Sequence, residues 1–398
     1  MGMIERFADL VVRAGVNVQP GQGVLLRSDT AHLEIARAVT EAAYAAGAAW
    51  VEPVWTDGPI RRSAVRHASL ETLSSSRPWA LERIRHWREQ GFASITLLGD
   101  ADPHLLDGAD PAKAAASPVE EARAMREALF DGIRWTAVGA PNPGWARQVF
   151  GEPDLDRLWA AVATAMRLDT DDPVAAWRDR AATLAERAER LNGLELTEVR
   201  YVGDGTDLTV GLVPGCRWTG GGLVDAAGIG YLPNIPTEEV FTSPDRRRAD
   251  GVIRLTKPVV IDGQLVTGLV LTFKDGAVVD LSATSGAEAA RASLDSDPGA
   301  RHLGEVSLVD RDSRIAKTGL VFHNTLFDEN AGCHVAWGQS FPFAVPGGLG
   351  MTPDQRFELG LNRSAVHVDV VIGGEGITVT GRAPSGFVEI IRDDEWVL

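Results

Sequence analysis

The pattern of apolar and polar residues predicts regular alternation of strands and helices in the first part of the chain. Short apolar runs predict strands at 23–28, 48–55, 93–98 and 134–139. Amphipathic segments between them predict helices at 30–46, 78–90 and 118–130. Strand and helix in strict alternation are typical of βαβ units, so we expect a parallel sheet with flanking helices.

The later part of the chain has a different pattern. Two more helices are predicted at 154–166 and 173–191, the second with Pro173 at a helix-start position. Strand-like segments separated by glycine turns then follow at 194–201, 207–212, 252–255, 265–273, 277–283, 366–372 and 376–381. We therefore predict an α/β N-terminal domain over residues 1–192 and an α+β, largely antiparallel C-terminal domain over residues 193–398.

Length and composition support two domains. A chain of 398 residues exceeds the size at which single cores stop growing. It has no apolar run near the roughly 20 residues that span a bilayer, and its first residues do not resemble a signal peptide. We expect a cytoplasmic protein with no membrane partner. The net charge of −16 argues against a nucleic-acid partner, which needs a basic surface.

Potential metal ligands gather in one stretch of the C-terminal part. Cys216 and Cys333 have no CxxC spacing, so any metal must be held by oxygen and nitrogen. His367 and Asp369 lie two apart in a predicted strand, which directs both side chains to the same face. No nucleotide-binding glycine motif stands at a predicted strand end. These features favour a divalent metal site over a nucleotide site.

The segment before His334 adds further carboxylates. We interpret Asp328 and Glu329 as a helix entry, with His334 one turn further along the same helix. Upstream, the Glu238-Glu239 pair and the single Glu305 stand among apolar residues. Burying this number of ionisable groups without partners costs free energy. Either the groups are exposed, or a cation compensates their charge.

Four segments of the chain resemble those of the M29 metallopeptidases, the family of aminopeptidases T, S and II. They are L-P-N-I-P-T-E-E-V-F-T-S-P at 232–244, residues 303–309, N-T-L-F-D-E-N-A-G-C-H at 324–334, and residues 367–373. The resemblance implies a cytosolic, homodimeric exopeptidase that removes N-terminal residues from peptides with a free N-terminus. It also implies two divalent metal ions, zinc, cobalt or manganese, and makes residues 193–398 the catalytic metal-binding domain, with residues 1–192 a scaffold that shapes the substrate site.

The resemblance also assigns roles to individual residues. The matching metal ligands are Glu239, Glu305, His334, His367 and Asp369. Glu329 matches the acidic residue that serves as general base or bridging group. A slip of one residue would exchange Glu239 for Glu238, so the choice within this pair stays open.

The chain departs from the family at two positions. Phe341 replaces the tyrosine of the family pattern H-L-A-L-G-x-x-Y-P, and His323 stands where a second tyrosine is common. Loss of an oxyanion-type donor lowers rates by a factor of roughly 10²–10³. Our hypothesis is that His323 or a bound water substitutes for the missing hydroxyl. A peptidase-like protein with altered or lost activity is the alternative.

A second alternative is a ring-cleaving dioxygenase of the same fold, resembling the dihydroxypyridine dioxygenases. It would hold a single Fe(II) with His334, His367 and Asp369. Such a site has no use for Glu239, Glu305 and Glu329, so the ligand count favours the peptidase.

Overall fold

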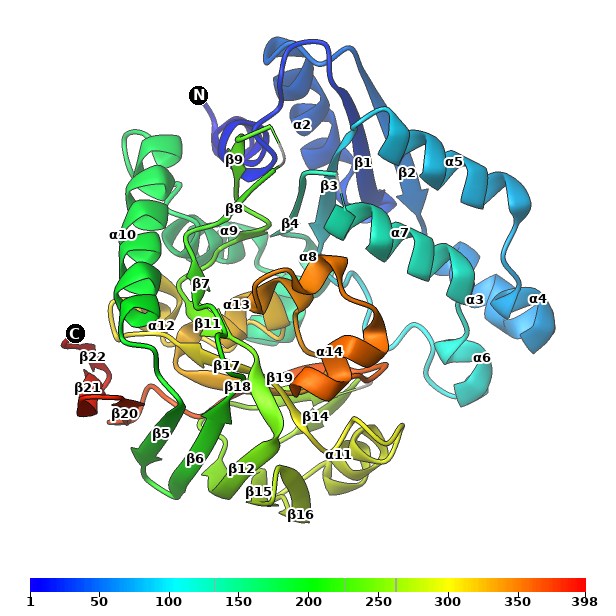
Figure 1. The fold of residues 1–398 in the computed structure, drawn as a ribbon. Helices are drawn as coiled ribbons and strands as arrows, with labels where there is room; N and C mark the ends of the chain where they lie inside the picture. The colour runs from blue at the N-terminus through cyan, green and yellow to red at the C-terminus, as the bar shows by residue number, and fades with distance from the viewer. Residues whose placement is uncertain (132, 226, 262) are drawn as a thin grey trace. The chain divides into compact units, whose positions relative to one another are not determined.

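The computed structural model describes residues 1–131, 133–225, 227–261 and 263–398, and the chain forms two compact units (Figure 1). The first unit contains Met1–Arg178 and Gly222–Ile235, and the second contains Asp179–Gly221 and Pro236–Leu398. The chain passes between them within helix α10 (Pro173–Gly193). The boundary predicted from sequence, between residues 192 and 193, lies at the end of this same helix, and this division into domains stays a prediction.

The first unit is built on a five-stranded sheet with the strand order β10-β4-β3-β1-β2, in which all neighbours are parallel. Its strands are β1 (Gly23–Asp29), β2 (Trp50–Thr56), β3 (Ala93–Leu98), β4 (Trp135–Gly139) and β10 (Asn234–Ile235). The predicted parallel sheet is therefore confirmed. Strand β10 comes from the returning segment, which also forms the short hairpin of β8 (Leu223–Val224) and β9 (Gly230–Tyr231).

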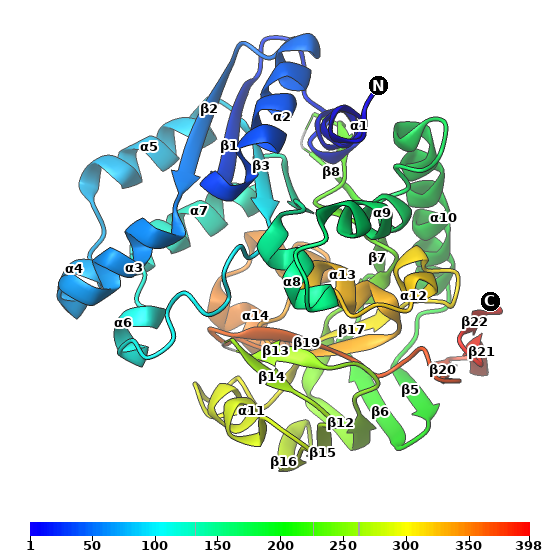
Figure 2. The same ribbon diagram turned by 180° about the vertical axis from the view of Figure 1, so that it is seen from behind.

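Helices cover the sheet of the first unit on both faces (Figures 1 and 2). On one face, Leu25 of β1 packs into a core with Trp87 of α5 and Ala128 of α7. The helices are α1 (Met3–Leu10), α2 (Leu33–Ala45), α3 (Gly58–His67), α4 (Leu70–Ser74), α5 (Pro78–Glu89), α6 (Pro111–Ala115), α7 (Val119–Asp131), α8 (Pro143–Phe150) and α9 (Leu155–Ala165), with the short η1 (Val11–Gly15) and η2 (Thr30–His32).

The described part of the second unit contains two large antiparallel sheets and the two-stranded antiparallel sheet β13-β14. The larger has the order β16-β15-β12-β6-β5-β20-β21-β22, and the smaller has the order β19-β18-β17-β11-β7. The larger sheet contains β5 (Glu198–Gly203), β6 (Thr206–Leu212), β12 (Pro244–Arg254), β15 (Val270–Lys274), β16 (Ala277–Ser282), β20 (Thr378–Ala383), β21 (Gly386–Arg392) and β22 (Glu395–Trp396). The smaller contains β7 (Thr219–Gly220), β11 (Val240–Thr242), β17 (Leu303–Leu308), β18 (His334–Gly338) and β19 (His367–Val371).

The two sheets share one hydrophobic core, which includes the fully buried Tyr201 of β5 and Trp337 of β18. The predicted α+β, largely antiparallel architecture is confirmed. The remaining elements of this unit are β13 (Val259–Ile261), β14 (Gln264–Val266), α11 (Ala287–Leu294), α12 (Arg314–Thr318), α13 (Thr325–Asp328) and α14 (Pro353–Leu359), with the short η3 (Glu329–Ala331), η4 (Pro342–Ala344) and η5 (Gly348–Gly350).

Two local predictions were wrong. The single strand expected at 265–273 is split into β14 and β15, because Gly268 between them has a φ of +58°, which a strand does not accommodate. His334 was expected on a helix, but it is the first residue of β18. The helical segment ends at Ala331, because Gly332 is fully extended and crosses close to the backbone of Gly373.

At Gly338, the backbones of β18 and of the segment that leads into β19 approach each other closely. Gly338 has a φ of +103°, pairs in register with His367, and a Cβ there would lie 2.1 Å from the carbonyl oxygen of Val366. We therefore expect Gly338→Ala to lower the free energy of unfolding by about 3 kcal/mol or more. Gly347→Ala is the matched control, because Gly347 has a φ of +71° but open space around it, and only a strain of about 1–2 kcal/mol is expected. Denaturant unfolding of both variants measures the difference, and equal losses would contradict the steric argument.

Candidate metal centre

Four neighbouring strands of the smaller sheet bring the candidate ligands together. Glu239 directly precedes β11, and Glu305 lies in β17. His334 begins β18, while His367 and Asp369 lie in β19. The strands are adjacent in the order β19-β18-β17-β11, so side chains from distant parts of the sequence converge.

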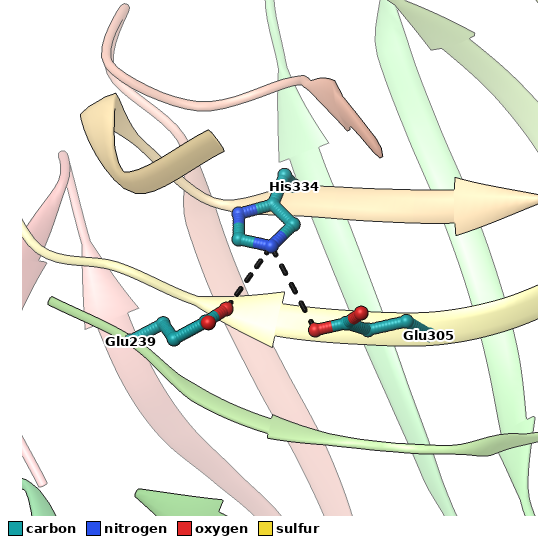
Figure 3. Close-up of side chains that lie close together, drawn as sticks. All are labelled: Glu239, Glu305 and His334. Carbon is teal, nitrogen blue, oxygen red and sulfur yellow. Dashed lines mark ion pairs between the residues drawn. The ribbon is translucent and has the colours of Figure 1, made fainter. Parts of the chain in front are cut away.

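The ligand atoms form two groups that share one carboxylate. His334 Nε2 lies 3.1 Å from Glu239 Oε2 and 3.8 Å from Glu305 Oε1, with both carboxylates directed at the ring (Figure 3). The other oxygen of Glu305 lies 3.2 Å from His367 Nε2, which is also 3.4 Å from Asp369 Oδ1. Within each group, one ligand atom per residue lies within 4.8 Å of the others, a spacing that suits a shared cation. Glu305 therefore faces both imidazoles.

The hydrogen bonds of the two imidazoles indicate which ring nitrogen faces the carboxylates. Nδ1 of His367 lies 2.8 Å from the carbonyl oxygen of Gln339, and Nδ1 of His334 lies 3.3 Å from that of Gly332. A carbonyl only accepts, so each Nδ1 donates and a neutral ring presents the lone pair of Nε2 to the carboxylates. Lone pairs of nitrogen and oxygen repel, so either a proton on Nε2 or a metal cation lies between each ring and the carboxylates. A set of imidazole nitrogens and carboxylate oxygens fits zinc, cobalt or manganese.

The electrostatics of the cluster point the same way. Burial by itself would lower the pKa of His334, but its hydrogen bonds with Glu239 and Glu305 raise that pKa well above the usual value. The pKa of His367 is also raised well above the usual value, because Asp369 and Glu305 outweigh the effect of burial. The cluster thus attracts protons strongly when no other cation is present. A divalent ion would compete for the same sites.

Supporting contacts separate the two residues of the Glu238-Glu239 pair. Glu239 Oε2 accepts a hydrogen bond from the buried Ser307 hydroxyl at 2.8 Å, in addition to facing His334. The Glu238 side chain is fully buried and forms an ion pair with Arg180 Nε at 2.6 Å. The geometry therefore directs Glu239 into the cluster and Glu238 to α10.

A second buried carboxylate joins the same ionic network. Asp310 lies 2.5 Å from an Arg187 nitrogen and 3.8 Å from an Arg180 nitrogen. Asn330 accepts from the Glu238 backbone N–H at 2.6 Å and so fixes the segment that carries Glu239. The sequence prediction missed these supporting residues. The two arginines lie on one face of α10, and their spacing was the only signal in the sequence.

Glu329 lies beside the cluster but outside both three-residue groups. Asn330 Nδ2 donates to Glu329 Oε1 at 3.4 Å. Burial, followed by the charges of Asp369 and Glu239, raises the pKa of Glu329 well above its usual value. Glu329 and Asp369 line a small pocket. Its other walls are the apolar residues Pro258, Val259, Val260, Val321 and Val371 and the polar segment of His323, Asn324, Thr325 and Asp328. A partly accessible carboxyl group with a raised pKa thus stands next to the candidate ligands.

His323 stands on a tight turn beside this pocket. It has a φ of +53°, which non-glycine residues rarely adopt, and burial lowers the pKa of its ring. Asp328 closes the turn by accepting from the N–H groups of Phe322 at 2.7 Å and Asn324 at 3.0 Å. Burial raises the pKa of Asp328 to about 6 despite these hydrogen bonds. Asp328 therefore acts as a turn residue, and His323 lines the pocket.

Phe341 provides an aromatic wall next to the candidate ligand His367. The ring centroids of Phe341 and His367 are 5.1 Å apart. Phe341 also stacks on Phe343 at 5.2 Å and meets Phe241 edge-on at 5.3 Å. These contacts hold the ring firmly in an apolar cluster, with no hydroxyl group on the ring that faces the site.

The cluster is suited to divalent metal ions, and comparison with known proteins gives the class and the family. A model of the family described as thermophilic metalloprotease (M29) matches residues 2–396. The chain belongs to this M29 metallopeptidase family, as predicted from its sequence. Its enzyme class is that of its named relatives, which are aminopeptidases.

The relatives are similar over their whole length. Aminopeptidase T of Thermus thermophilus is 38% identical, with 99% of this chain and 98% of the relative covered. Aminopeptidase 2 of Geobacillus stearothermophilus is 37% identical, with 99% and 97% covered. The solved structure of wild-type AmpT from Thermus thermophilus matches with a TM-score of 0.91 at 37% identity, covering 100% of this chain and 99% of that one.

No helix in the described residues is long and apolar enough to cross a membrane.

The ion pair between Arg180 and Glu238 yields a stability prediction. We expect Arg180→Met to lower the free energy of unfolding by about 3–5 kcal/mol, because it removes a cation from the two buried carboxylates Glu238 and Asp310. Arg178→Met, at an exposed position on the same helix, is the control and should change it by less than about 0.5 kcal/mol. Denaturant unfolding measures both. Equal stability of the two variants would show that the network is not needed to hold the Glu239 segment.

Proposed function

We propose that this protein is a metal-dependent aminopeptidase that releases N-terminal residues from peptides with a free N-terminus. The observation that carries the proposal is the position of Glu305, whose two oxygens face two separate imidazole nitrogens. A carboxylate shared in this way is suited to bridging two cations. The names of the relatives, aminopeptidases 2 and T, support the choice of substrate.

Five residues would hold the two divalent ions, zinc, cobalt or manganese. One ion would take Glu239, Glu305 and His334, and the other would take Glu305, His367 and Asp369. Bound divalent cations lower the pKa of water and polarise the carbonyl group of the bond to be cleaved. The hydrogen bonds from the two Nδ1 atoms to backbone carbonyls keep each ring in the tautomer that such binding needs.

Glu329 is the general base in this proposal. It would take a proton from the attacking water and deliver it to the leaving amine. Burial and the charges of Asp369 and Glu239 raise its pKa, so the Glu329 carboxyl group would hold the proton between the two steps. Because Asn330 Nδ2 engages Oε1, the proton would be carried on Oε2.

The mononuclear iron dioxygenase is the weaker alternative. It would use His334, His367 and Asp369 and would leave Glu239 and Glu305 beside the metal without a role. The close contacts of both glutamates with the imidazoles favour the two-metal peptidase. The homodimer and the cytoplasmic location implied by the family resemblance stay predictions.

The two roles proposed for carboxylates can be separated by mutation. We expect the wild-type protein to contain about two metal ions per chain. Glu305→Ala should lose both ions and all hydrolysis of leucine anilide, because it removes the ligand common to both groups. Glu329→Gln should keep the metal and lower kcat by a factor of about 10²–10⁴.

Elemental analysis of protein purified without chelator, combined with anilide hydrolysis, measures these outcomes. Glu358→Ala, at an exposed glutamate of α14, is the control for Glu305→Ala and should change neither metal content nor rate. Full activity of Glu329→Gln would remove Glu329 from the mechanism. One iron per chain without hydrolysis would favour the dioxygenase.

Phe341 gives a separate prediction about rate. If the missing hydroxyl limits turnover, Phe341→Tyr should raise kcat by about tenfold or more with little change in KM, since an oxyanion donor acts mainly in the transition state. Steady-state kinetics on leucine anilide measures this. An unchanged kcat, with a loss of turnover in His323→Phe, would instead support the hypothesis that His323 supplies the missing interaction.

A further inference from the structure

An open crevice of about 770 Å³ lies in the first unit, at the carboxyl ends of its central strands. Residues at the ends of β1 and β3 line it, including Ser28, Asp29, Leu98 and Gly99. The strand order β2-β1-β3-β4 means that the chain leaves β1 and β3 in opposite directions. Open parallel sheets characteristically bind ligands at such a switch point, outside the carboxyl ends of the strands. The crevice does not involve any of the candidate metal ligands.

Arg27 is the first observation that points to a ligand here. It lies in β1 between its register partners Val54 and Thr96, and all three line the crevice. Its side chain is half-buried, and it has no hydrogen bond or ion pair within the described residues. Burial lowers the pKa of its guanidinium, which reflects the cost of a charge without a partner. Arg62 of α3 also lines the crevice, and within the same described ranges it too has no counter-ion.

Four carboxylates also line the crevice, those of Asp29, Asp57, Asp100 and Asp102, and within the described residues none of them pairs with Arg27 or Arg62. Asp29 accepts from the Ala31 N–H and from the Thr56 hydroxyl, each at 3.0 Å. Asp57 accepts from the Ile60 N–H and from the Thr30 hydroxyl, each at 2.9 Å. Both carboxylates cap helices and join two loops, so their oxygens are already engaged. Asp100 accepts from the Asp102 N–H at 3.0 Å and Asp102 accepts from the His104 N–H at 3.1 Å, so these carboxylates are also engaged with the backbone. Arg27 is therefore a half-buried cation without a partner in the described residues, while Arg62 is an exposed one.

His32 provides an independent observation among the lining residues. It is only 1% exposed, and its Nδ1 has no hydrogen-bond partner in the described part of the chain. Asn142 Oδ1 accepts from the Trp145 N–H, so its Nδ2 faces His32 Nε2 at 3.0 Å. Burial lowers the pKa of the His32 ring, while Asp29 and a backbone hydrogen bond with Ala140 raise it. A buried ring nitrogen without a partner is costly, and a polar group of a ligand in the crevice would satisfy it.

We propose that this crevice binds the α-carboxylate of an amino acid or of a short peptide, with Arg27 as its central ligand and Arg62 as its second cation. A planar guanidinium pairs with a carboxylate through two parallel hydrogen bonds. A phosphate dianion fits less well, because the capping carboxylates Asp29 and Asp57 stand at the helix starts that would otherwise attract it.

The test is a binding measurement that does not depend on catalysis. N-acetyl-leucine and N-acetyl-leucinamide differ only in the carboxylate, and neither offers a free N-terminus for cleavage. Calorimetry on the full-length protein as purified should show binding of N-acetyl-leucine only. Arg27→Met should weaken that binding by about tenfold to a hundredfold, the value of a charge-assisted hydrogen-bonded pair. Arg61→Met is the matched control, because Arg61 lies next to Arg62 but bonds to the Ala114 carbonyl.

Folding does not obscure this result. Arg27→Met replaces an unpaired, half-buried charge with an apolar side chain of similar length, so its Tm should equal or exceed that of the wild type. Equal binding of N-acetyl-leucine by the wild type and by Arg27→Met would overturn the proposal. Equal binding of the amide, or Arg27-dependent binding of inorganic phosphate without binding of N-acetyl-leucine, would overturn it as well.

A kinetic comparison identifies the source of the carboxylate, and this part alone rests on the proposed function. If the ligand is the C-terminus of the substrate, Arg27→Met should raise KM about tenfold or more for a tripeptide with a free C-terminus but not for its C-terminal amide. If it is a free amino acid, KM should be unchanged for both peptides while binding of N-acetyl-leucine is lost. Failure of all hydrolysis would test the metal centre and leave the binding result standing.

Discussion

The convergence of three carboxylates and two imidazole nitrogens is the constraint on which the candidate metal centre depends. Glu239, Glu305 and Asp369 face Nε2 atoms at distances between 3.1 and 3.8 Å in largely buried surroundings. Such a group is costly unless cations lie among its members. The smaller sheet nevertheless brings these groups together, because its strand register places β17, β18 and β19 side by side, with a close backbone approach at Gly338.

The same unit compensates other buried charges without a ligand. Glu238 and Asp310 are paired with arginines of α10, so these carboxylates are neutralised by the chain itself. The adjacent Glu239 has no such partner and faces His334 instead. Glu238 is therefore a structural carboxylate, because an arginine neutralises it. Glu239 is a candidate ligand, because it faces an imidazole instead. Sequence spacing could not make that distinction, because it depends on which way two successive side chains turn.

Much of the fold follows from local patterns. The parallel strands were predictable because short, mostly apolar runs and amphipathic helices alternate at short spacing, as at 93–98 and 78–90. The placement of His334 in a strand was not predictable from local patterns. Gly332 ends the helical segment where it approaches Gly373, and this contact is remote in sequence. The candidate ligands were found through the family resemblance and the His367-Asp369 alternation. The supporting Arg180, Arg187 and Ser307 needed the three-dimensional arrangement, since each acts through a partner far away in the chain.

Within the described residues, each unit contains partly buried charges without a counter-charge, and these charges are negative in the second unit and positive in the first. In the second unit the chain gathers carboxylates in excess, and the ions that would balance them are cations. In the first unit Arg27 is held between two strands of the sheet while neighbouring carboxylates are engaged in capping, so the ion that would balance it is an anion. An uncompensated, partly buried charge lowers stability, and a fold retains it at little net cost where a ligand brings the counter-charge. The sign of the missing charge then predicts the class of ligand before its identity is known.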